Sequence, residues 1–259
     1  DEKSIYYLLQ YNYIPQQLSI FKNIKKLPPS SLLTINLNDF KKNGLDSIRN
    51  QKYWSIPKNY SHEIENYNHL DERLEKLLTK SVKSQTISDV PVGAFLSGGI
   101  DSSLIVSILQ SQSRMPINTF TIGFHEKEFN EAKKADEISK FLNTNHNEVY
   151  FSSKDAQDLI PDLPKVFSEP FADPSMLPTI LISKIARKSV TVALSGDGGD
   201  EIFGGYNRYK MLPTIRKIKS FIPSIIHNPI FNFYNLFSDN LWDSFGKSLN
   251  IDQGSDKLR

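Results

Sequence analysis

The stretch VPVGAFLSGGIDSS occupies residues 90–103 and decides the fold. Its apolar half, at 92–96, predicts a buried strand, and a helical pattern at 102–112 follows almost at once. The serines and glycines between the two form a turn that leads into a helix N-terminus. Such a turn presents unpaired backbone N–H groups and the positive end of the helix dipole to an anion. The stretch therefore predicts a phosphate-binding loop.

The side chains of this loop fit the chemistry of ATP cleavage. The serine hydroxyls add donors for phosphate oxygens, and Asp101 can hold a divalent cation against the same phosphates. The loop lacks the lysine of G-x-x-x-x-G-K-[ST], and the dinucleotide signature G-x-G-x-x-G is absent. We interpret it as a loop that splits ATP into AMP and pyrophosphate, with a capped surface turn as the alternative.

Strand and helix patterns alternate along the chain after this loop. Further strands are predicted at 118–124, 146–151 and 190–194, and further helices at 131–142, 154–167 and 176–188. Pro161 and Pro164 are expected to interrupt the second of these helices. Alternating strands and helices indicate an α/β fold with a parallel sheet flanked by helices. Ligands of such sheets bind outside the carboxyl ends of the strands, where the loop after Leu96 lies.

The residues before the loop follow a less regular pattern. They predict a helix at 5–13, a strand at 32–37, a polar loop at 38–51 and a helix at 71–84. The last of these helices carries an apolar stripe, made of Leu70, Leu74, Leu77, Leu78 and Val82. From 207 onward the pattern is mixed and helical, with prolines that limit helix length.

A second glycine-rich loop, SGDGGDEIFGGY at 195–206, follows the strand at 190–194. Asp200 and Glu201 stand where the next helix would begin, a position that the helix dipole favours for carboxylates. Because both loops follow strands of one parallel sheet, Asp101 and Asp200 could share Mg²⁺ on a leaving pyrophosphate. A helix cap with a metal-free turn is the alternative.

Composition excludes several classes of protein. The net charge is +2, so nucleic-acid binding is not expected, and lysine pairs such as Lys25-Lys26 are predicted to be solvated. No stretch reaches the roughly 20 apolar residues of a membrane span, and no secretory signal pattern is present. The chain has no cysteine, which excludes disulfides and thiolate metal sites and is compatible with a cytoplasmic location.

Two other groups of residues carry weaker signals. The stretch SEPFADP at 168–174 is either a proline-rich loop or part of the active site. The five histidines show no metal-ligand spacing, so we expect them at the surface or in local hydrogen bonds. They are His62, His69, His125, His146 and His227.

The motifs resemble the synthetase domain of the glutamine-hydrolysing asparagine synthetase family. The resemblance rests on SGGIDSS at 97–103, FTIGF at 120–124 and SGDGGDEIFGGY at 195–206. FSEPFADPSMLPT at 167–179 resembles the bacterial members, and residues 5–37 resemble the tail of the family's glutaminase domain. The implied fold is that of the ATP-pyrophosphatases, the adenine nucleotide alpha hydrolase or HUP-like fold.

The resemblance also implies a domain division. Residues 1–57 would be the remnant of an N-terminal glutaminase domain, and 58–259 an ATP-dependent synthetase domain truncated at its C-terminal end. The family's glutaminase uses an N-terminal cysteine that this chain lacks, so we expect no glutaminase activity from the chain alone. For the full-length protein the resemblance leaves a homodimer open.

The implied reaction is the adenylation of aspartate, with release of pyrophosphate and transfer of ammonia from glutamine to give asparagine and AMP. ATP and Mg²⁺ are the implied cofactors, and small molecules the only implied partners. The implied catalytic residues are Asp101, Asp197 and Asp200, and the first and last of these would bind Mg²⁺. The implied nucleotide-binding residues are Leu96, Ser97, Gly98, Gly99, Asp101, Ser102, Ile122, Ser195 and Gly196.

Several alternatives share these motifs. An enzyme of the same superfamily could amidate a sugar uronic acid or close a β-lactam ring. A tRNA-modifying ATP pyrophosphatase would use the same type of loop, but the weak basicity and the absence of cysteine disfavour it. A nucleotide-binding fragment without turnover is the alternative that is not an enzyme.

Overall fold

The computed structural model describes residues 1–57, 69–126, 130–207, 209, 211–213 and 216–217. The chain divides into two compact units, Asp1–Gly196 and Asp197–Arg259. The boundary between glutaminase remnant and synthetase domain, predicted at residue 57, remains a prediction.

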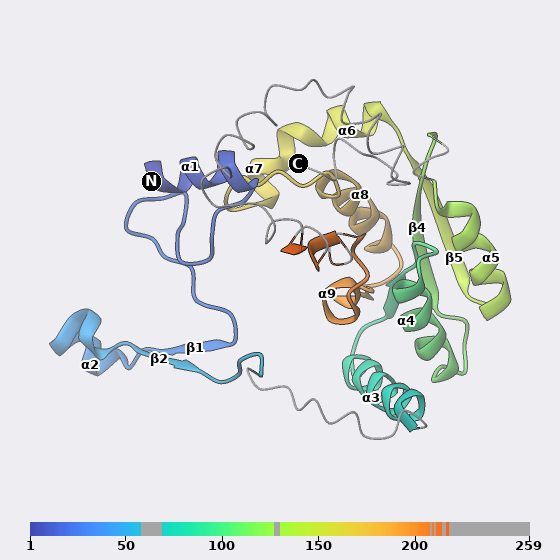
Figure 1. Ribbon diagram of the computed structural model, residues 1–259, viewed down its shortest axis with the longest axis horizontal. Helices are drawn as coiled ribbons and strands as arrows, with labels where there is room; N and C mark the ends of the chain where they lie inside the picture. Colours follow the sequence, from blue (N-terminus) through green and yellow to red (C-terminus); the bar gives the residue numbers. More distant parts are fainter. Residues whose placement is uncertain (58–68, 127–129, 208, 210, 214–215, 218–259) are drawn as a thin grey trace. The chain divides into compact units, whose positions relative to one another are not determined.

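The first unit contains a parallel sheet of four strands in the order β5-β4-β3-β6, of which Figure 1 labels β4 and β5. The strands are β3 (Val92–Phe95), β4 (Asn118–Phe124), β5 (Asn145–Phe151) and β6 (Val192–Leu194). Their register pairs Phe95 with Phe120 and Ala94 with Leu194. This arrangement confirms the predicted α/β fold with a parallel sheet.

Helices cover both faces of this sheet. Helix α3 (Leu70–Gln85) precedes β3 in the chain. The helices that follow β3 in the first unit are α4 (Ile100–Ser111), α5 (Ala132–Leu142), α6 (Ser153–Leu159), α7 (Leu163–Val166) and α8 (Met176–Ala186). A short 3₁₀ turn, Ile160–Asp162, joins α6 to α7, where the sequence predicted a helix interrupted by prolines. The prediction of an interrupted helix is therefore confirmed.

The core divides according to the alternation of side chains along the strands. Ala94 and Leu96 pack in one cluster with Val82 of α3, Val106 of α4 and Ala135 of α5. On the other face, Phe120 packs with Ala186 of α8 and Val190, and Phe95 and Ile182 pack against this cluster. In the apolar stripe predicted for α3, Val82 is buried and Leu78 packs against the same cluster. Leu70, Leu74 and Leu77, nearer the start of the helix, are exposed.

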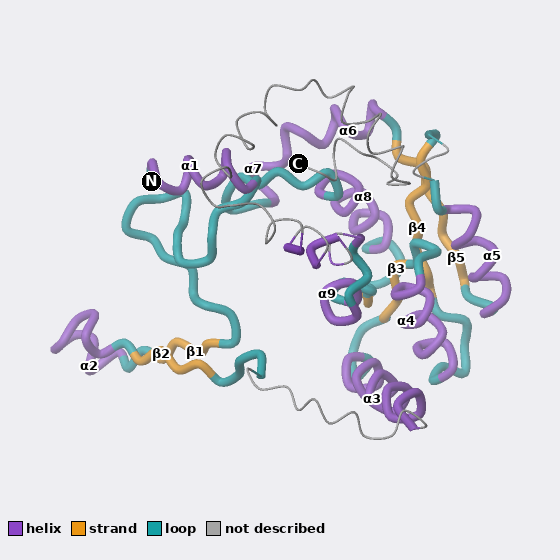
Figure 2. The backbone as a smooth tube through the Cα atoms, viewed as in Figure 1, coloured by secondary structure: helices purple, strands orange, loops and turns teal. Residues whose placement is uncertain are grey.

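The N-terminal part holds α1 (Glu2–Tyr11) and a hairpin. The hairpin pairs β1 (Ser31–Thr34) with β2 (Arg49–Lys52) in antiparallel register, and α2 (Leu37–Asn43) with a 3₁₀ turn (Gly44–Ser47) connects them. Figure 2 shows both strands beside α2. The polar loop predicted at 38–51 is therefore wrong.

Local hydrogen bonds explain why this segment is ordered without an apolar pattern. The Asn36 side chain accepts from the backbone N–H groups of Asn38 and Asp39, which caps α2. All four residues of β2 are exposed, so only backbone pairing with β1 defines that strand. Hydrophobic periodicity cannot detect an element of this kind.

The second unit contributes α9 (Gly199–Phe203). Asp200 and Glu201 lie in its first turn, as the sequence predicted. Most of the mixed helical region predicted from 207 onward lies outside the described residues. Among the helices that the structure describes, none combines the length and apolar character needed to cross a bilayer.

His146 is a half-buried histidine near the start of β5. Its Nδ1 lies 2.9 Å from Thr119 Oγ1, which lies 2.9 Å from Thr144 Oγ1. Its Nε2 is buried and has no hydrogen-bond partner among the described residues. Burial lowers the pKa of His146, although the carboxylates of Glu148 and Asp136 act in the opposite direction. The folded protein therefore favours the neutral ring.

We expect this histidine to make the protein less stable in mild acid. Because the pKa of His146 is lower in the folded than in the unfolded chain, the unfolded chain binds more protons below the usual pKa of 6.5. Each unit of this difference corresponds to about 1.4 kcal/mol. Urea unfolding at about pH 7.5 and about pH 5.5 should show a lower free energy of unfolding at the acidic value.

The variant His146→Asn should lose much of this pH dependence, because asparagine does not titrate. His125→Asn is the matched control, since His125 is exposed and stacks on Tyr150, with ring centroids 5.4 Å apart. An unchanged pH dependence in His146→Asn would contradict the assignment.

Candidate functional site

The strand order indicates where a ligand would bind at one end of the sheet. From β3 the chain proceeds to β4 and β5 on one side, and then returns to place β6 on the other side of β3. In open α/β sheets, ligands bind outside the carboxyl ends of the strands at the point where the order reverses. That point lies between β3 and β6, the two strands that the glycine-rich loops follow.

The first loop is closed by its own serines. The Ser102 hydroxyl accepts from the Ser97 backbone N–H at 3.2 Å, and the two hydroxyls lie 2.9 Å apart. The Gly99 N–H donates to Ser97 Oγ, and the Ser103 hydroxyl donates to the Gly99 carbonyl at 2.6 Å. Since the first N–H groups of α4 have no acceptor within the helix, the turn keeps donors for an anion.

Gly98 fixes this loop against the start of α5. Its φ is +81°, and an added Cβ would lie 2.9 Å from Lys134 Cβ and 3.1 Å from the Ala135 nitrogen. Both the backbone conformation and the space therefore require glycine. A side chain here would push the first loop away from α5.

Gly196 brings the second loop onto the first. An added Cβ at Gly196 would lie 2.7 Å from the Ser102 nitrogen and 3.0 Å from the Asp101 carbonyl carbon. These are backbone atoms of the first turn of α4, so they cannot move aside as a flexible side chain would. The start of the second loop, at Gly196, therefore meets the first turn of α4, at the same end of the sheet as the first loop.

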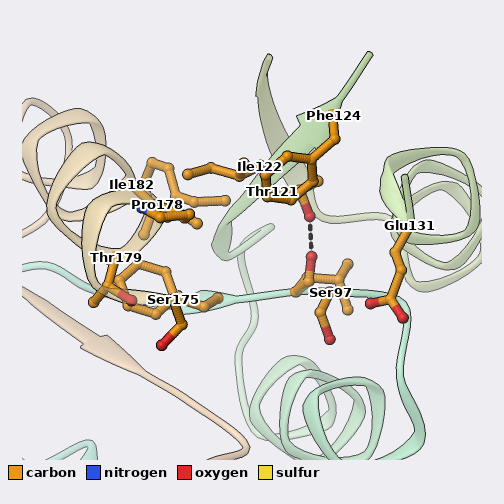
Figure 3. A pocket seen from close by; sticks show the side chains of 12 residues that line it. Ser97, Thr121, Ile122, Phe124, Glu131, Ser175, Pro178, Thr179 and Ile182 are labelled. Atoms are coloured by element: carbon orange, nitrogen blue, oxygen red, sulfur yellow. Dashed lines mark hydrogen bonds between the residues drawn. The ribbon is translucent and has the colours of Figure 1, made fainter. Parts of the chain in front are cut away.

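A pocket of about 200 Å³ adjoins the first loop (Figure 3). Three predicted nucleotide-binding residues line it: Leu96, Ser97 and Ile122. Ile122, Pro178 and Ile182 form an apolar part of the lining (Figure 3). Ser175 and Thr179 lie on the α8 side of the pocket, and Ser97, Thr121 and Glu131 lie on the opposite side (Figure 3). The described residues that line it are Phe95, Leu96, Ser97, Phe120, Thr121, Ile122, Phe124, Glu131, Ser175, Pro178, Thr179 and Ile182.

Sequence reasoning missed several residues of this pocket. Thr121 is buried, and its hydroxyl donates to the Leu96 carbonyl just before the loop (Figure 3). Glu131 lines the pocket from the residue before α5. Only the place of these two residues in the sequence could have indicated them, because Thr121 lies within the FTIGF motif and Glu131 directly precedes a helix. Ser175 and Thr179 fall within the weaker FSEPFADPSMLPT motif at 167–179.

Ser195, directly after β6, and Asp101 belong to the first unit, whereas Asp197 and Asp200 lie in the second unit. Asp197 is exposed, and Asp200 is half-buried in the first turn of α9. The Asp200 carboxylate lies so close to Gly205 that an added Cβ there would collide with it. Because Asp101 belongs to the first unit, sharing of Mg²⁺ by Asp101 and Asp200 remains a prediction.

No cluster of three or more His, Cys, Asp or Glu side chains that could hold a metal occurs among the described residues. His62 and His227 lie outside those residues. His146 is locally hydrogen-bonded and His125 is exposed, as predicted. Lys26 differs from its prediction, because it forms an ion pair with Glu169 instead of being solvated.

The chain is similar to proteins of one family. The asparagine synthase family model matches residues 73–256. A Methanocaldococcus jannaschii protein named as a glutamine-hydrolyzing asparagine synthetase is 40% identical over 227 residues, covering 86% of this chain and 42% of that protein. Asparagine synthetase 1 of Bacillus subtilis, also named glutamine-hydrolyzing, is 33% identical over 210 residues, covering 81% of this chain and 32% of that protein.

Among solved structures, the chain is similar to the glutamine-dependent NAD+ synthetase from Acinetobacter baumannii in complex with ADP. The TM-score is 0.40 with 16% identity, covering 67% of this chain and 31% of that chain. The chain spans less than half the length of the two curated relatives. Both glycine-rich loops and the pocket lie inside the stretch that the family model matches, and the chain therefore belongs to the asparagine synthase family.

Proposed function

We propose that this chain is the adenylating part of an ATP-dependent amide-forming enzyme that converts aspartate to asparagine. The observation that carries the proposal is the meeting of the two loops, where Gly196 packs against the first turn of α4. This contact supports a site in which phosphate donors and an adjoining pocket serve one nucleotide. The names of the relatives support an amide-forming, carbon–nitrogen ligase reaction.

ATP would lie with its adenosine in the pocket and its phosphates on the first loop. The apolar part of the lining, with Ile122 and Leu96, suits a purine ring. Ser195 and Gly196 would contact the adenosine moiety from the second loop. The pyrophosphate would accept hydrogen bonds from the turn formed by Ser97, Gly98, Gly99 and Ser102.

The reaction would proceed in two displacements. A carboxylate oxygen of aspartate attacks the α-phosphorus, and the bond to the β,γ-pyrophosphate breaks to leave an acyl-adenylate. Ammonia then attacks the acyl carbon, a C–N bond forms, and AMP departs as the nitrogen loses a proton. The loop's donors stabilise the charge that develops on the departing pyrophosphate. Asp197 would lie near the amino-acid substrate.

The residues present fit Mg²⁺. In proteins Mg²⁺ is usually held by one or two carboxylates together with substrate phosphates and water, so a dense cluster of acidic residues is not required. Asp101 lies in the first turn of α4, directly beside the phosphate loop. We propose that Asp101 and Asp200 hold the ion, which neutralises phosphate charge when bound.

Ammonia would come from glutamine in the full-length protein, in a location that we propose is cytoplasmic. The chain contains no cysteine, so it does not carry a cysteine nucleophile for glutamine hydrolysis. We also propose that the full-length protein forms a homodimer. Free ammonium ions can replace glutamine in any test of this chain.

The proposal predicts pyrophosphate release that depends on aspartate. We expect the chain, and more strongly its full-length parent, to release pyrophosphate from ATP when Mg²⁺, aspartate and ammonium ions are all present. Asparagine and AMP should appear in equal amounts, measured by chromatography. Omitting aspartate is the control.

Two results would contradict this assignment. Stimulation by a sugar uronic acid and not by aspartate would replace the substrate while keeping the chemistry. ATP binding without an acyl-adenylate from any tested carboxylate would indicate a nucleotide-binding protein without turnover.

A further inference from the structure

An ion pair joins the N-terminal segment to the proline-rich loop that precedes α8. Lys26 Nζ contacts the Glu169 carboxylate, and the two side chains are only 32% and 22% exposed. The Ile20 N–H also donates to Glu169 at 3.4 Å, and Lys26 Nζ donates to the Ile14 carbonyl at 3.0 Å. We call these four residues the clasp.

A second contact holds the same two segments together. The Ala172 N–H donates to the Asn12 carbonyl at 2.7 Å. Within the loop, Phe167 and Phe171 pack edge to face, with ring centroids 4.7 Å apart. Residues 12–26 and 167–172 are therefore joined by side-chain charge and by backbone hydrogen bonds, and the loop is also braced internally.

The loop leads directly into the wall of the pocket. Asp173 Oδ1 accepts from the Ser175 N–H at 2.8 Å and from the Ser175 hydroxyl at 2.6 Å. The Thr179 N–H donates to the Ser175 carbonyl at 2.9 Å, which continues this turn into α8. Ser175, Thr179 and Ile182 then face the pocket (Figure 3).

We infer that the clasp sets the position of the first turns of α8 and thereby the affinity of the pocket for adenosine. Lys26 and Glu169 are positioning residues, because they act on the nucleotide through Ser175, Thr179 and Ile182. This inference rests on the proposed function, since it takes ATP as the ligand. It assigns residues 12–26, far from the glycine-rich loops in the sequence, to the nucleotide site.

The phosphate loop gives the inference a sharp test. The clasp holds the segment that leads into α8, and α8 contributes residues to the pocket lining. The first loop is held instead by hydrogen bonds between Ser97 and Ser102, which do not involve the clasp. Loss of the clasp should therefore weaken binding of ATP and leave binding of inorganic pyrophosphate unchanged. General destabilisation would affect both ligands.

The experiment measures dissociation constants of ATP and of inorganic pyrophosphate for the chain, by calorimetry with Mg²⁺ present. Lys26→Ala and Glu169→Gln should each raise the dissociation constant of ATP by about tenfold. Substitution of residues that act on a site through other residues has effects of about this size. The doubly substituted chain, Lys26→Glu with Glu169→Lys, should recover most of the affinity. Lys25→Ala is the matched control, because Lys25 is exposed.

Each outcome separates the inference from the proposed function. If the unsubstituted chain binds neither ligand, the proposed function fails and the inference fails with it. If it binds ATP, and the Lys26 and Glu169 variants bind ATP equally well, the inference alone is overturned. A parallel loss for both ligands, accompanied by a lower melting temperature, would overturn it too, because the role would then be only structural.

Discussion

Replacing Gly196 by alanine is expected to weaken ATP binding by about a hundredfold, the effect that a displacement of roughly 1 Å has on a positioned site. The new Cβ would lie 2.7 Å from the Ser102 nitrogen, so either the second loop or the first turn of α4 must move. Both movements separate the N–H and hydroxyl groups proposed to bind the phosphates of ATP from the residues proposed to contact adenosine. Calorimetric titration of the variant with ATP and Mg²⁺ measures the effect.

A control must show that the loss does not arise from lower stability. Gly44→Ala introduces a side chain at a φ of +57° with no atom within 4 Å of the added Cβ, so it strains the backbone without touching the loops. This variant should bind ATP as the unsubstituted chain does, even where its melting temperature is lower. Unchanged ATP affinity in Gly196→Ala would refute the close contact of the two loops.

The variant Asp101→Asn is expected to lower amide formation in the full-length parent by at least about a hundredfold. The amide keeps the size of the side chain and removes the charge that we propose for Mg²⁺, and loss of one group that stabilises developing charge has effects of about this size. Helix α4 should persist, because its first turn is also fixed by the hydrogen bonds of Ser102 and Ser103 to the Gly99 carbonyl. Circular dichroism checks the fold and product chromatography the rate.

The matched control for this variant is Asp136→Asn. Asp136 is a carboxylate on α5 that pairs with Lys140 at 2.6 Å, and it lies outside the pocket lining. Its substitution should leave turnover unchanged. Near-normal turnover in Asp101→Asn, with the same dependence on Mg²⁺ concentration, would remove Asp101 from the metal site.

The sheet and its loops were predictable because burial leaves a pattern in the sequence. Strand β4 was predicted with its observed ends, since its apolar residues stand out against polar neighbours. The first loop was predictable as a turn between a strand and a helix, because serines and glycines directly before a helical pattern are typical of a helix N-terminus. The meeting of the loops followed from the parallel sheet, which brings successive strand ends to one edge.

Other features depend on contacts between distant residues, which leave no periodic pattern. Strand β2 is exposed throughout and exists only because β1 supplies hydrogen-bond partners. Lys26 looked like a solvated lysine, since nothing near it in the sequence indicates Glu169 as its partner. Glu131 reaches the pocket from the start of a helix, where a carboxylate is common for reasons of the dipole alone.

The contact of Gly196 with α4 also has a consequence for the order in which the site is made. Ribosomal synthesis releases the first loop and α4 early, but Gly196 follows β6, the last strand of the sheet. A nascent chain in which β6 has not yet emerged from the ribosome can form the first loop. It cannot yet form the contact between Gly196 and α4. On the proposed function, we therefore expect full affinity for ATP only after β6 has paired with β3, and we expect ATP to stabilise chains that have reached that stage.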